Sequence, residues 1–211
     1  GMLYRQGYFT QQIDSHGNQL AQYKPSRFLD LPVQPAQDET GTAIQVSIQV
    51  PGRSVDLKVW VARVGHNHLY LLDSDLASNQ DEDRRITYQL YGGDATNRLL
   101  QEMVLGIGGV RAKRAMGLAP SVWPIDEGHA AFQVLERCRE LVAGGLPFAA
   151  ALEAVAANTV FTTHTPVPAG HDIFDHRLIE FYFSEYVAEL GISMEHFLSL
   201  GASPVNSHGF N

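Results

Sequence analysis

Two segments of the chain carry polar side chains suited to positioning the hydroxyl groups of a ligand, and each follows a predicted strand. The later segment, residues 158–172 (NTVFTTHTPVPAGHD), predicts a short buried strand that stops in a loop rich in proline and glycine. The earlier segment, residues 121–129 (SVWPIDEGH), has the same layout about one βαβ unit upstream. Polar clusters at the carboxyl ends of successive parallel strands share one crevice, so we expect a ligand site there. The side chains concerned are Glu127, His129, His164, His171 and Asp172.

A simpler interpretation exists for each of these clusters. Glu127 precedes a predicted helix, where the helix dipole favours a carboxylate by roughly 0.3–1 kcal/mol. The later loop is also compatible with a structural turn that carries incidental histidines. A third interpretation is a Zn²⁺ site, for which the chain offers His164, His171, Asp172, Asp175 and His176. Their spacing matches no strong metal motif, and Asp175 is a good N-cap for the next helix, so the metal site is the least favoured alternative.

Two glycine-rich segments are also candidates for ligand-binding loops. Residues 106–109 (GIGG) lack the third glycine of a dinucleotide-binding fingerprint, and they lie inside a helical pattern. We therefore expect these glycines to allow close packing of that helix against a helix or a sheet. Residues 91–94 (YGGD) predict a flexible loop before the helix, in which Asp94 could hydrogen-bond a sugar or stay solvated.

Composition narrows the class of ligand. The formal net charge is -8, from 15 basic and 23 acidic residues, which disfavours nucleic acid and is compatible with neutral ligands such as sugars. The one cysteine, Cys138, cannot form an internal disulfide and lies in a helical pattern. No apolar run approaches the roughly 20 residues that span a bilayer, and no signal peptide pattern is present. We expect a cytoplasmic protein that binds neither nucleic acid nor a membrane.

The first 80 residues predict antiparallel β structure. Two segments that flank the turn DSHGN form a predicted hairpin, and a surface connection with three prolines follows at residues 25–42. A meander of three strands comes next, at residues 43–50, 55–64 and 69–73. Its first strand alternates well, with four apolar residues on one face: Ile44, Val46, Ile48 and Val50.

From residue 81 onward the pattern becomes α/β. A helix is predicted from an N-cap at Thr96 to about Gly117, with one apolar stripe. Two strands follow at residues 122–125 and 159–163, and further helices at 128–143, 148–156, 175–190 and 193–200. Strand–helix–strand order predicts parallel pairing with a right-handed crossover. The fold class is therefore α/β: an antiparallel β-meander followed by a partial Rossmann-like βαβ section.

Several motifs, in this order along the chain, resemble those of the α-glucan phosphorylases (glycogen and maltodextrin phosphorylases) in their shorter bacterial form. They cover nearly the whole chain: LYRQGYF (3–9), VWVARV (59–64), LYLLD (69–73), QLYGGD (89–94), LGIGGVRA (105–112), DEGHAAF (126–132) and FTTHTPVPAGHD (161–172). The last is the strongest single match. Such enzymes are retaining glycosyltransferases that cleave α-1,4-glucans with inorganic phosphate and release glucose 1-phosphate.

The resemblance implies a fold of two Rossmann-like domains and roles for individual residues of this chain. It implies that the catalytic His164 lies against the transferred glucosyl unit, with its side chain near the 6-hydroxyl. It implies that Glu127 and His129 hold the glucan in the acceptor subsite. Asp94 would belong to a gating loop over the active site, and Arg98 to the helix beside it. Pyridoxal phosphate acts in this family through its phosphate group.

The resemblance also implies that residues 1–211 are part of an N-terminal domain, with a β-rich section (1–80) and an α/β section (81–211). In the family, a glycine-rich loop stands upstream of the first matching motif, and the lysine that binds the cofactor belongs to a C-terminal domain. We therefore expect no pyridoxal phosphate on this chain, no activity from it alone, and exposed apolar surface or self-association. The alternative functions are a stand-alone glucan-binding module and a metal-dependent hydrolase that uses residues 164–176.

Two residues depart from the family pattern near the expected acceptor subsite. Pro124 stands where a histidine is common, and it is predicted to remove a hydrogen-bond donor from its strand. Asp126 stands where an asparagine is usual, and it adds a charge near the glucan. The central expectation is that the rings of His129 and His164 face one sugar-sized hollow, of which this chain supplies one wall.

Overall fold

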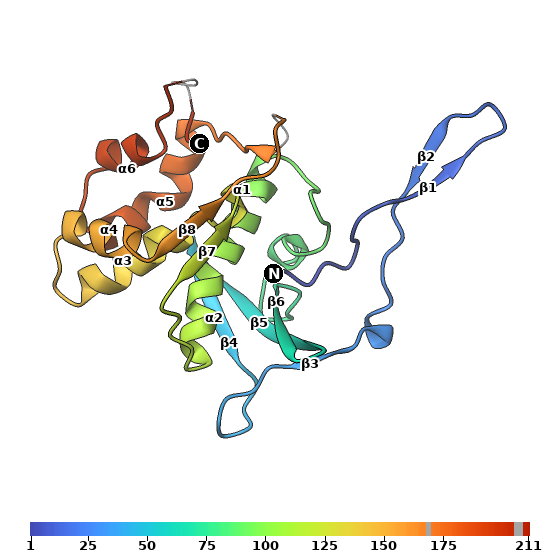
Figure 1. The fold of residues 1–211 in the computed structure, drawn as a ribbon, viewed down its shortest axis with the longest axis horizontal. Helices are drawn as coiled ribbons and strands as arrows, with labels where there is room; N and C mark the ends of the chain where they lie inside the picture. The colour runs from blue at the N-terminus through green and yellow to red at the C-terminus, as the bar shows by residue number, and fades with distance from the viewer. Residues whose placement is uncertain (168–169, 205–208) are drawn as a thin grey trace.

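The computed structural model describes residues 1–167, 170–204 and 209–211 (Figure 1). These residues form a mixed α/β fold, with antiparallel strands in the first part of the chain and one parallel strand pair in the second. The predicted fold class is confirmed. Among the described residues, no helix combines the length and the apolar character that crossing a membrane requires.

A β-hairpin near the N-terminus projects away from the rest of the molecule (Figure 1). Its strands are β1 (Thr10–Ile13) and β2 (Gln19–Gln22), which pair antiparallel. The turn forms because the Asp14 carboxylate accepts hydrogen bonds from the amides of His16 and Asn18, each at 2.8 Å. The predicted hairpin is confirmed.

A four-stranded antiparallel sheet is built around one long strand. β5 (Arg53–Val64) pairs with β3 (Val33–Pro35) and β4 (Gln45–Val50) along one edge and with β6 (Asn67–Asp73) along the other. The predicted meander is thereby confirmed. The prediction of a plain surface connection is wrong where β3 forms, because three residues ending in proline are too short to produce a detectable alternation.

Helical segments cover one face of this sheet. The helix predicted after residue 95 forms as three consecutive pieces: α1 (Ala95–Met103), a π-helical turn (η3, Val104–Gly108) and α2 (Gly109–Ala115). The pieces η3 and α2 pack against β4. Both apolar stripes face the core as predicted. Val46 is partly buried, and the other residues are buried: Ile44, Ile48, Val50, Leu99, Leu100, Met103, Val104, Ile107 and Val110.

Two of the three glycines in this helix allow the close packing that the sequence predicts. A methyl group on Gly106 would lie 2.8 Å from Cβ of Phe132, and one on Gly108 would lie 2.6 Å from Cδ1 of Leu57. Gly106 thus allows the helix to approach the segment that leads into α3, and Gly108 allows it to approach strand β5 of the sheet. The prediction is wrong for Gly109, where an added methyl group would meet no described atom outside its own helix within 4 Å.

The second part of the chain contains the predicted βαβ unit. β7 (Trp123–Asp126) and β8 (Thr159–Thr162) pair in parallel, residue for residue in that order. Two helices connect them, α3 (Gln133–Ala143) and α4 (Phe148–Ala156), and they pack against each other. The register brings the carboxyl ends of both strands to the same edge, so the segments that follow them are neighbours.

The strand β8 is exposed, which corrects the prediction of a buried strand. Val160 is 52% exposed and Phe161 is 58% exposed. Exposed apolar side chains therefore occur here as expected, while self-association through them stays a prediction. Pro124 removes no bond between the two strands. The amide of Trp123 donates to the carbonyl of Asn158, just before β8, at 2.9 Å, and that of Glu127 donates to the carbonyl of Thr162 at 2.8 Å, so the nitrogen of Pro124 faces the other edge.

Two helices complete the described chain, α5 (His176–Leu190) and α6 (Met194–Leu200). The predicted N-cap of α5 is confirmed, because the carboxylate of Asp175 accepts from the amide of Arg177. The hydroxyl of Ser193 caps α6 in the same way, accepting from the amide of His196. Residues 205–208 lie outside the described residues.

A buried carboxylate joins three of these helices. Glu136 on α3 accepts hydrogen bonds from Arg111 on α2 at 2.8 Å, from Arg139 at 2.7 Å, and from the hydroxyl of Tyr186 on α5 at 2.8 Å. Burial alone would raise the pKa of Glu136, but the hydrogen bonds from Arg139 and Arg111 outweigh it and lower the pKa. The charge is therefore paired inside the core and fixes how the helices meet.

Candidate functional site

Glu127 connects the ends of the two parallel strands. It follows β7 directly and has a φ of 54°, a left-handed conformation that a glutamate adopts when surrounding contacts hold it there. Its buried carboxylate accepts from the amides of His164 (3.0 Å) and Thr165 (2.6 Å) and from the hydroxyl of Thr165 (2.9 Å). These bonds, the one from the His164 amide first, lower the pKa of Glu127 to about 2. An ionised Glu127 thus holds the loop that carries His164.

The ring of His164 lies on the outer side of this loop. Its side chain is 59% exposed, and Nε2 lies 3.1 Å from Oδ1 of Asp126. A carboxylate can only accept, so this hydrogen bond assigns a proton to Nε2. In the neutral ring, Nδ1 then remains an acceptor. Asp126 therefore fixes how the exposed imidazole presents its two nitrogens.

Asp94 caps α1, which corrects the predicted N-cap at Thr96. Its carboxylate accepts from the amide of Asn97 at 2.9 Å, and the side chain of Asn97 donates to the carbonyl of Gly92 at 2.8 Å. These contacts fasten the glycine-rich loop to the start of the helix. The role of Asp94 in gating or in glucan binding stays a prediction.

Arg98 contacts two other residues of the predicted site, Asp172 and His129. Its Nη2 donates to Oδ2 of Asp172 at 2.6 Å and lies 3.5 Å from Nδ1 of His129. Its Nη1 donates to Gln101 at 3.1 Å, and the guanidinium lies 5.5 Å from the centre of the Tyr91 ring. The helix α1, the short 3-10 turn η4 (Gly128–Ala130) and the loop after β8 meet at this arginine.

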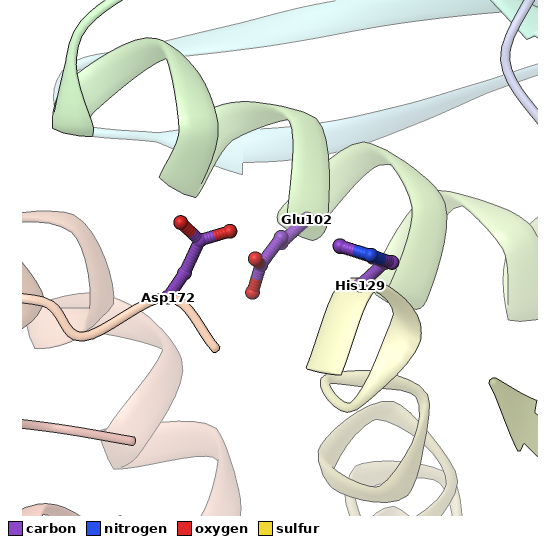
Figure 2. A group of neighbouring side chains, drawn as sticks. All are labelled: Glu102, His129 and Asp172. Carbon is purple, nitrogen blue, oxygen red and sulfur yellow. The ribbon is translucent and has the colours of Figure 1, made fainter. Parts of the chain in front are cut away.

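Glu102, one turn after Arg98, is a member of this cluster that the sequence analysis missed. Figure 2 shows its carboxyl group between Asp172 and His129. Its side chain is 8% exposed, and Oε1 has no hydrogen-bond partner among the described residues. Burial, followed by a hydrogen bond with Asp172 and by the charge of Asp172, raises the pKa of Glu102 to about 9. At neutral pH Glu102 therefore carries a proton.

Two cavities adjoin this cluster, and Glu102 lines both. The larger, of about 580 Å³, is mostly apolar and is lined among others by Phe132, Phe161, His171 and Asp172. The smaller, of about 110 Å³, is lined by Arg98 and His129 among others. His164 lines neither of these two cavities. A single hollow shared by the rings of His129 and His164 therefore stays a prediction.

Several known proteins are similar to this chain over most of its length. The maltodextrin phosphorylase of Thermococcus litoralis is 38% identical over 201 residues, which cover 95% of this chain and 24% of that protein. The glycogen phosphorylase of Mycobacterium tuberculosis is 42% identical over 192 residues, covering 88% of this chain and 22% of that protein. The glycogen phosphorylase of Aquifex aeolicus is 32% identical over 212 residues, covering 100% of this chain and 31% of that protein.

The chain is homologous to the α-glucan phosphorylases. The resemblance that its motifs predicted is thereby confirmed, although no protein-family model matches the chain. The chain spans between 22% and 31% of the length of these phosphorylases. Their activity, substrates and partners are therefore proposals for this chain.

The metal cluster considered as an alternative to the phosphorylase function does not form. In residues 1–167, 170–204 and 209–211, the one group of three possible metal ligands is Glu102, His129 and Asp172. Of the five residues proposed from the sequence, this group contains Asp172 alone. Asp175 serves as the N-cap of α5, which the sequence had also predicted. The geometry thus removes the basis for a hydrolase that uses residues 164–176.

Sequence reasoning missed two contributors to this candidate site. Glu102 interrupts an apolar run, LLQEMVL at residues 99–105, and a charged residue inside such a run was the available signal. Thr165 gives Glu127 both its amide and its hydroxyl, and no feature of its sequence neighbourhood marks that contact.

Proposed function

We propose that this chain forms one wall of the glucan-binding crevice of an α-glucan phosphorylase. That enzyme cleaves α-1,4-glucans with inorganic phosphate and releases glucose 1-phosphate. Homology to phosphorylases supports the reaction class. The observation that carries the proposal is the Glu127 contact, because it keeps Asp126 and His164 at one edge of a parallel strand pair. Ligands of parallel sheets bind beyond the carboxyl ends of the strands, which is this edge.

We assign His164 to the transferred glucosyl unit as the catalytic residue. Its ring is accessible, and the hydrogen bond to Asp126 fixes one ring nitrogen as a donor. A ring held in one orientation on a supported loop can position a sugar hydroxyl without first losing rotational freedom. Glu127 supports this arrangement through the backbone of residues 164 and 165, so its part in glucan binding is indirect.

We assign the acceptor side of the crevice to His129 and Arg98. His129 borders the smaller cavity, and Arg98 fixes its orientation from one side. Asp94 contributes by fastening the loop before α1, which passes beside the same cavity at Tyr91. These groups are polar and few, so the chain alone is expected to bind glucan weakly.

The residues of this chain do not fit pyridoxal phosphate. The cofactor requires a lysine for its imine, and the three lysines lie away from the crevice. The amine of Lys58 lies 4.2 Å from the ring centre of Trp60, and that of Lys113 lies 4.3 Å from the ring centre of Trp123. Lys24 is exposed beside the N-terminal hairpin. We therefore expect no pyridoxal phosphate to bind to the chain alone.

Calorimetric titration with maltoheptaose tests the proposed function. We expect binding of this α-1,4-glucan and no binding of the β-1,4-linked cellohexaose at the same concentration. His164→Ala is expected to weaken maltoheptaose binding about fivefold or more, the equivalent of one hydrogen bond of about 1 kcal/mol. The exposed His66, in the turn between β5 and β6, gives the matched control His66→Ala, which should bind as the original chain does.

Two results would contradict the proposal. One is the absence of maltoheptaose binding by a folded chain. The other is equal weakening by the His66 and His164 substitutions. An assay for glucose 1-phosphate release addresses the expected lack of activity, and sustained release by the chain alone would contradict that expectation.

A further inference from the structure

The guanidinium of Arg98 lies among three acceptor groups from three different elements. Its Nη2 is 2.6 Å from Oδ2 of Asp172, 3.5 Å from Nδ1 of His129 and 4.0 Å from Oε1 of Glu102. One atom from each of these three residues lies within 4.8 Å of the others, and Figure 2 shows the three side chains converging. The cluster thus joins α1, the turn η4 and the loop after β8.

Such a group resembles a metal site, but the guanidinium of Arg98 already lies within 4.0 Å of an acceptor atom of all three residues. Arg98 cannot lose its charge in a protein, and its Nη2 lies 2.6 Å from Oδ2 of Asp172. A divalent ion among the same three groups would stand beside this fixed positive charge. The arrangement is therefore organised around the arginine.

One cation, Arg98, faces two carboxyl groups in this cluster, so the proton on Glu102 decides how many negative charges the arginine has to balance. Ionised carboxylates can only accept hydrogen bonds, and a bond between Glu102 and Asp172 therefore requires a proton on one of them. Arg98 donates directly to Asp172, while Glu102 stands at 4.0 Å with Oε1 unpartnered among the described residues. The negative charge belongs on Asp172 and the proton on Glu102.

We propose that Glu102 is a positioning residue of the candidate site, which sets the ring tautomer of His129 through Asp172 and Arg98. The inference rests on the proposed function, because His129 is assigned there to the acceptor side of the glucan crevice. Glu102 itself touches no reacting group in this scheme.

The chain of contacts works in a defined direction. A protonated Glu102 donates to Asp172, and Asp172 holds Arg98 by a 2.6 Å hydrogen bond. Arg98 can only donate, so Nδ1 of His129 is held as the acceptor and the ring proton is left on Nε2. His129 then offers a donor on the side away from Arg98, which suits a glucan hydroxyl oxygen. Loss of the Glu102 proton would add a second carboxylate that competes for Arg98.

The other titratable and charged groups around Glu102 come from every neighbouring element. They are Arg98 on α1, His129 on η4, His171 and Asp172 after β8, Tyr91 before α1, and Tyr4 near the N-terminus. Burial raises the pKa of Tyr4 to about 12, so it stays protonated near pH 9. Burial would raise the pKa of Asp172, but hydrogen bonds from Arg98 and Glu102 outweigh it and lower the pKa. Of these carboxyl groups, Glu102 is the one that loses its proton on the alkaline side.

Long-range ¹H–¹⁵N spectra of the histidine rings test this inference without any glucan. The chain has nine histidines, and the signal that disappears in His129→Gln identifies the ring of interest. At pH 7 we expect His129 in the Nε2–H tautomer. Between pH 7 and pH 10 the original chain is expected to lose this single tautomer. Glu102→Gln, which keeps a donor but cannot ionise, is expected to retain it. The exposed Glu153 on α4 gives the matched control Glu153→Gln, which should behave as the original chain.

A second variant keeps the test decisive if Glu102→Gln does not fold. Asp172→Asn removes the charge that disfavours ionisation of Glu102, so the pH midpoint of the His129 change is expected to fall by about one unit or more. An Nδ1–H tautomer at pH 7, an unchanged tautomer at pH 10 in the original chain, or an unmoved midpoint in Asp172→Asn would each overturn the inference. Because no glucan is present, these results are separate from the calorimetric test of the proposed function.

Discussion

Replacing Glu102 by glutamine is predicted to change how folding stability depends on pH. The pKa of this carboxyl group rises from 4.5 to about 9 in the folded chain. Below pH 4.5 the group is protonated in both the folded and the unfolded chain. As the pH rises from 4.5 toward 9, the unfolded chain loses the proton while the folded chain keeps it. The free energy of unfolding therefore falls by about 1.4 kcal/mol for each pH unit in this window.

The size of the effect follows from the width of the window. Three pH units, from 5 to 8, correspond to about 4 kcal/mol, a large part of the roughly 5–15 kcal/mol that stabilises a typical domain. Glutamine has nearly the same shape and keeps a donor for Asp172, but it does not titrate. The stability of Glu102→Gln relative to the original chain should therefore rise by about 4 kcal/mol between pH 5 and pH 8.

Urea denaturation at pH 5, 6, 7 and 8 measures this difference, with the unfolding free energy extrapolated linearly to zero urea. Glu153→Gln is the control, because it makes the same chemical change at an exposed position of α4. Its profile should run parallel to that of the original chain. If the Glu102→Gln profile also runs parallel, the buried carboxyl group is ionised at neutral pH and the reasoning is refuted.

Three further predictions follow from the packing and the hydrogen bonds. Gly108→Ala should lower the unfolding free energy by about 1–3 kcal/mol, because the added methyl group would lie 2.6 Å from the side chain of Leu57. Gly109→Ala should raise the unfolding free energy by about 1 kcal/mol, because its methyl group has free space among the described residues and alanine favours the helix. Thermal melting of the two variants measures this difference. Glu127→Gln should speed hydrogen exchange of the His164 amide about tenfold, because it weakens the hydrogen bond that protects this amide. In the original chain, the protection of this amide from exchange should persist down to about pH 4 and be lost as the pH falls toward 2, where Glu127 becomes protonated. Glu136→Gln should cost about 3–5 kcal/mol in urea denaturation, since it leaves two arginines facing an uncharged group.

Local patterns predicted the elements of this fold well where one face is buried. The alternation from Ile44 to Val50 and the stripe from Leu99 to Val110 both reflect burial on one side, and in the structure both faces pack into the core, with Val46 partly buried. The strand β3 and the π-helical turn were not predictable in the same way. Each depends on a segment that is distant in the sequence. β3 forms because β5 extends beyond β4 and offers residues 60–62 as a pairing partner. The π-helical turn occurs where the helix packs against β4 and β6 of the sheet.

The neighbourhood of Glu127 and His164 was predictable from strand order, but its geometry was not. Two parallel strands with a helical crossover must end at the same edge, so the segments after β7 and β8 had to be neighbours. The sequence could not indicate that the carboxylate of Glu127 turns inward to the backbone of the loop. That outcome depends on the left-handed backbone at Glu127, and such a conformation is set by tertiary contacts.

The protonation state of Glu102 depends on its burial as well as on the charges of its neighbours. Four residues after Arg98, it has the spacing of an ordinary ion pair on the surface of a helix. An exposed pair would leave both groups charged and would contribute little. Here the arginine is taken by Asp172 from a distant part of the chain, and the glutamate is left buried with one oxygen unpartnered among the described residues. A carboxyl group in that position is most stable as the neutral acid, which can donate where an ionised one cannot. The helix spacing that suggests a salt bridge therefore produces a hydrogen-bond donor instead, because a third residue from another element completes the cluster.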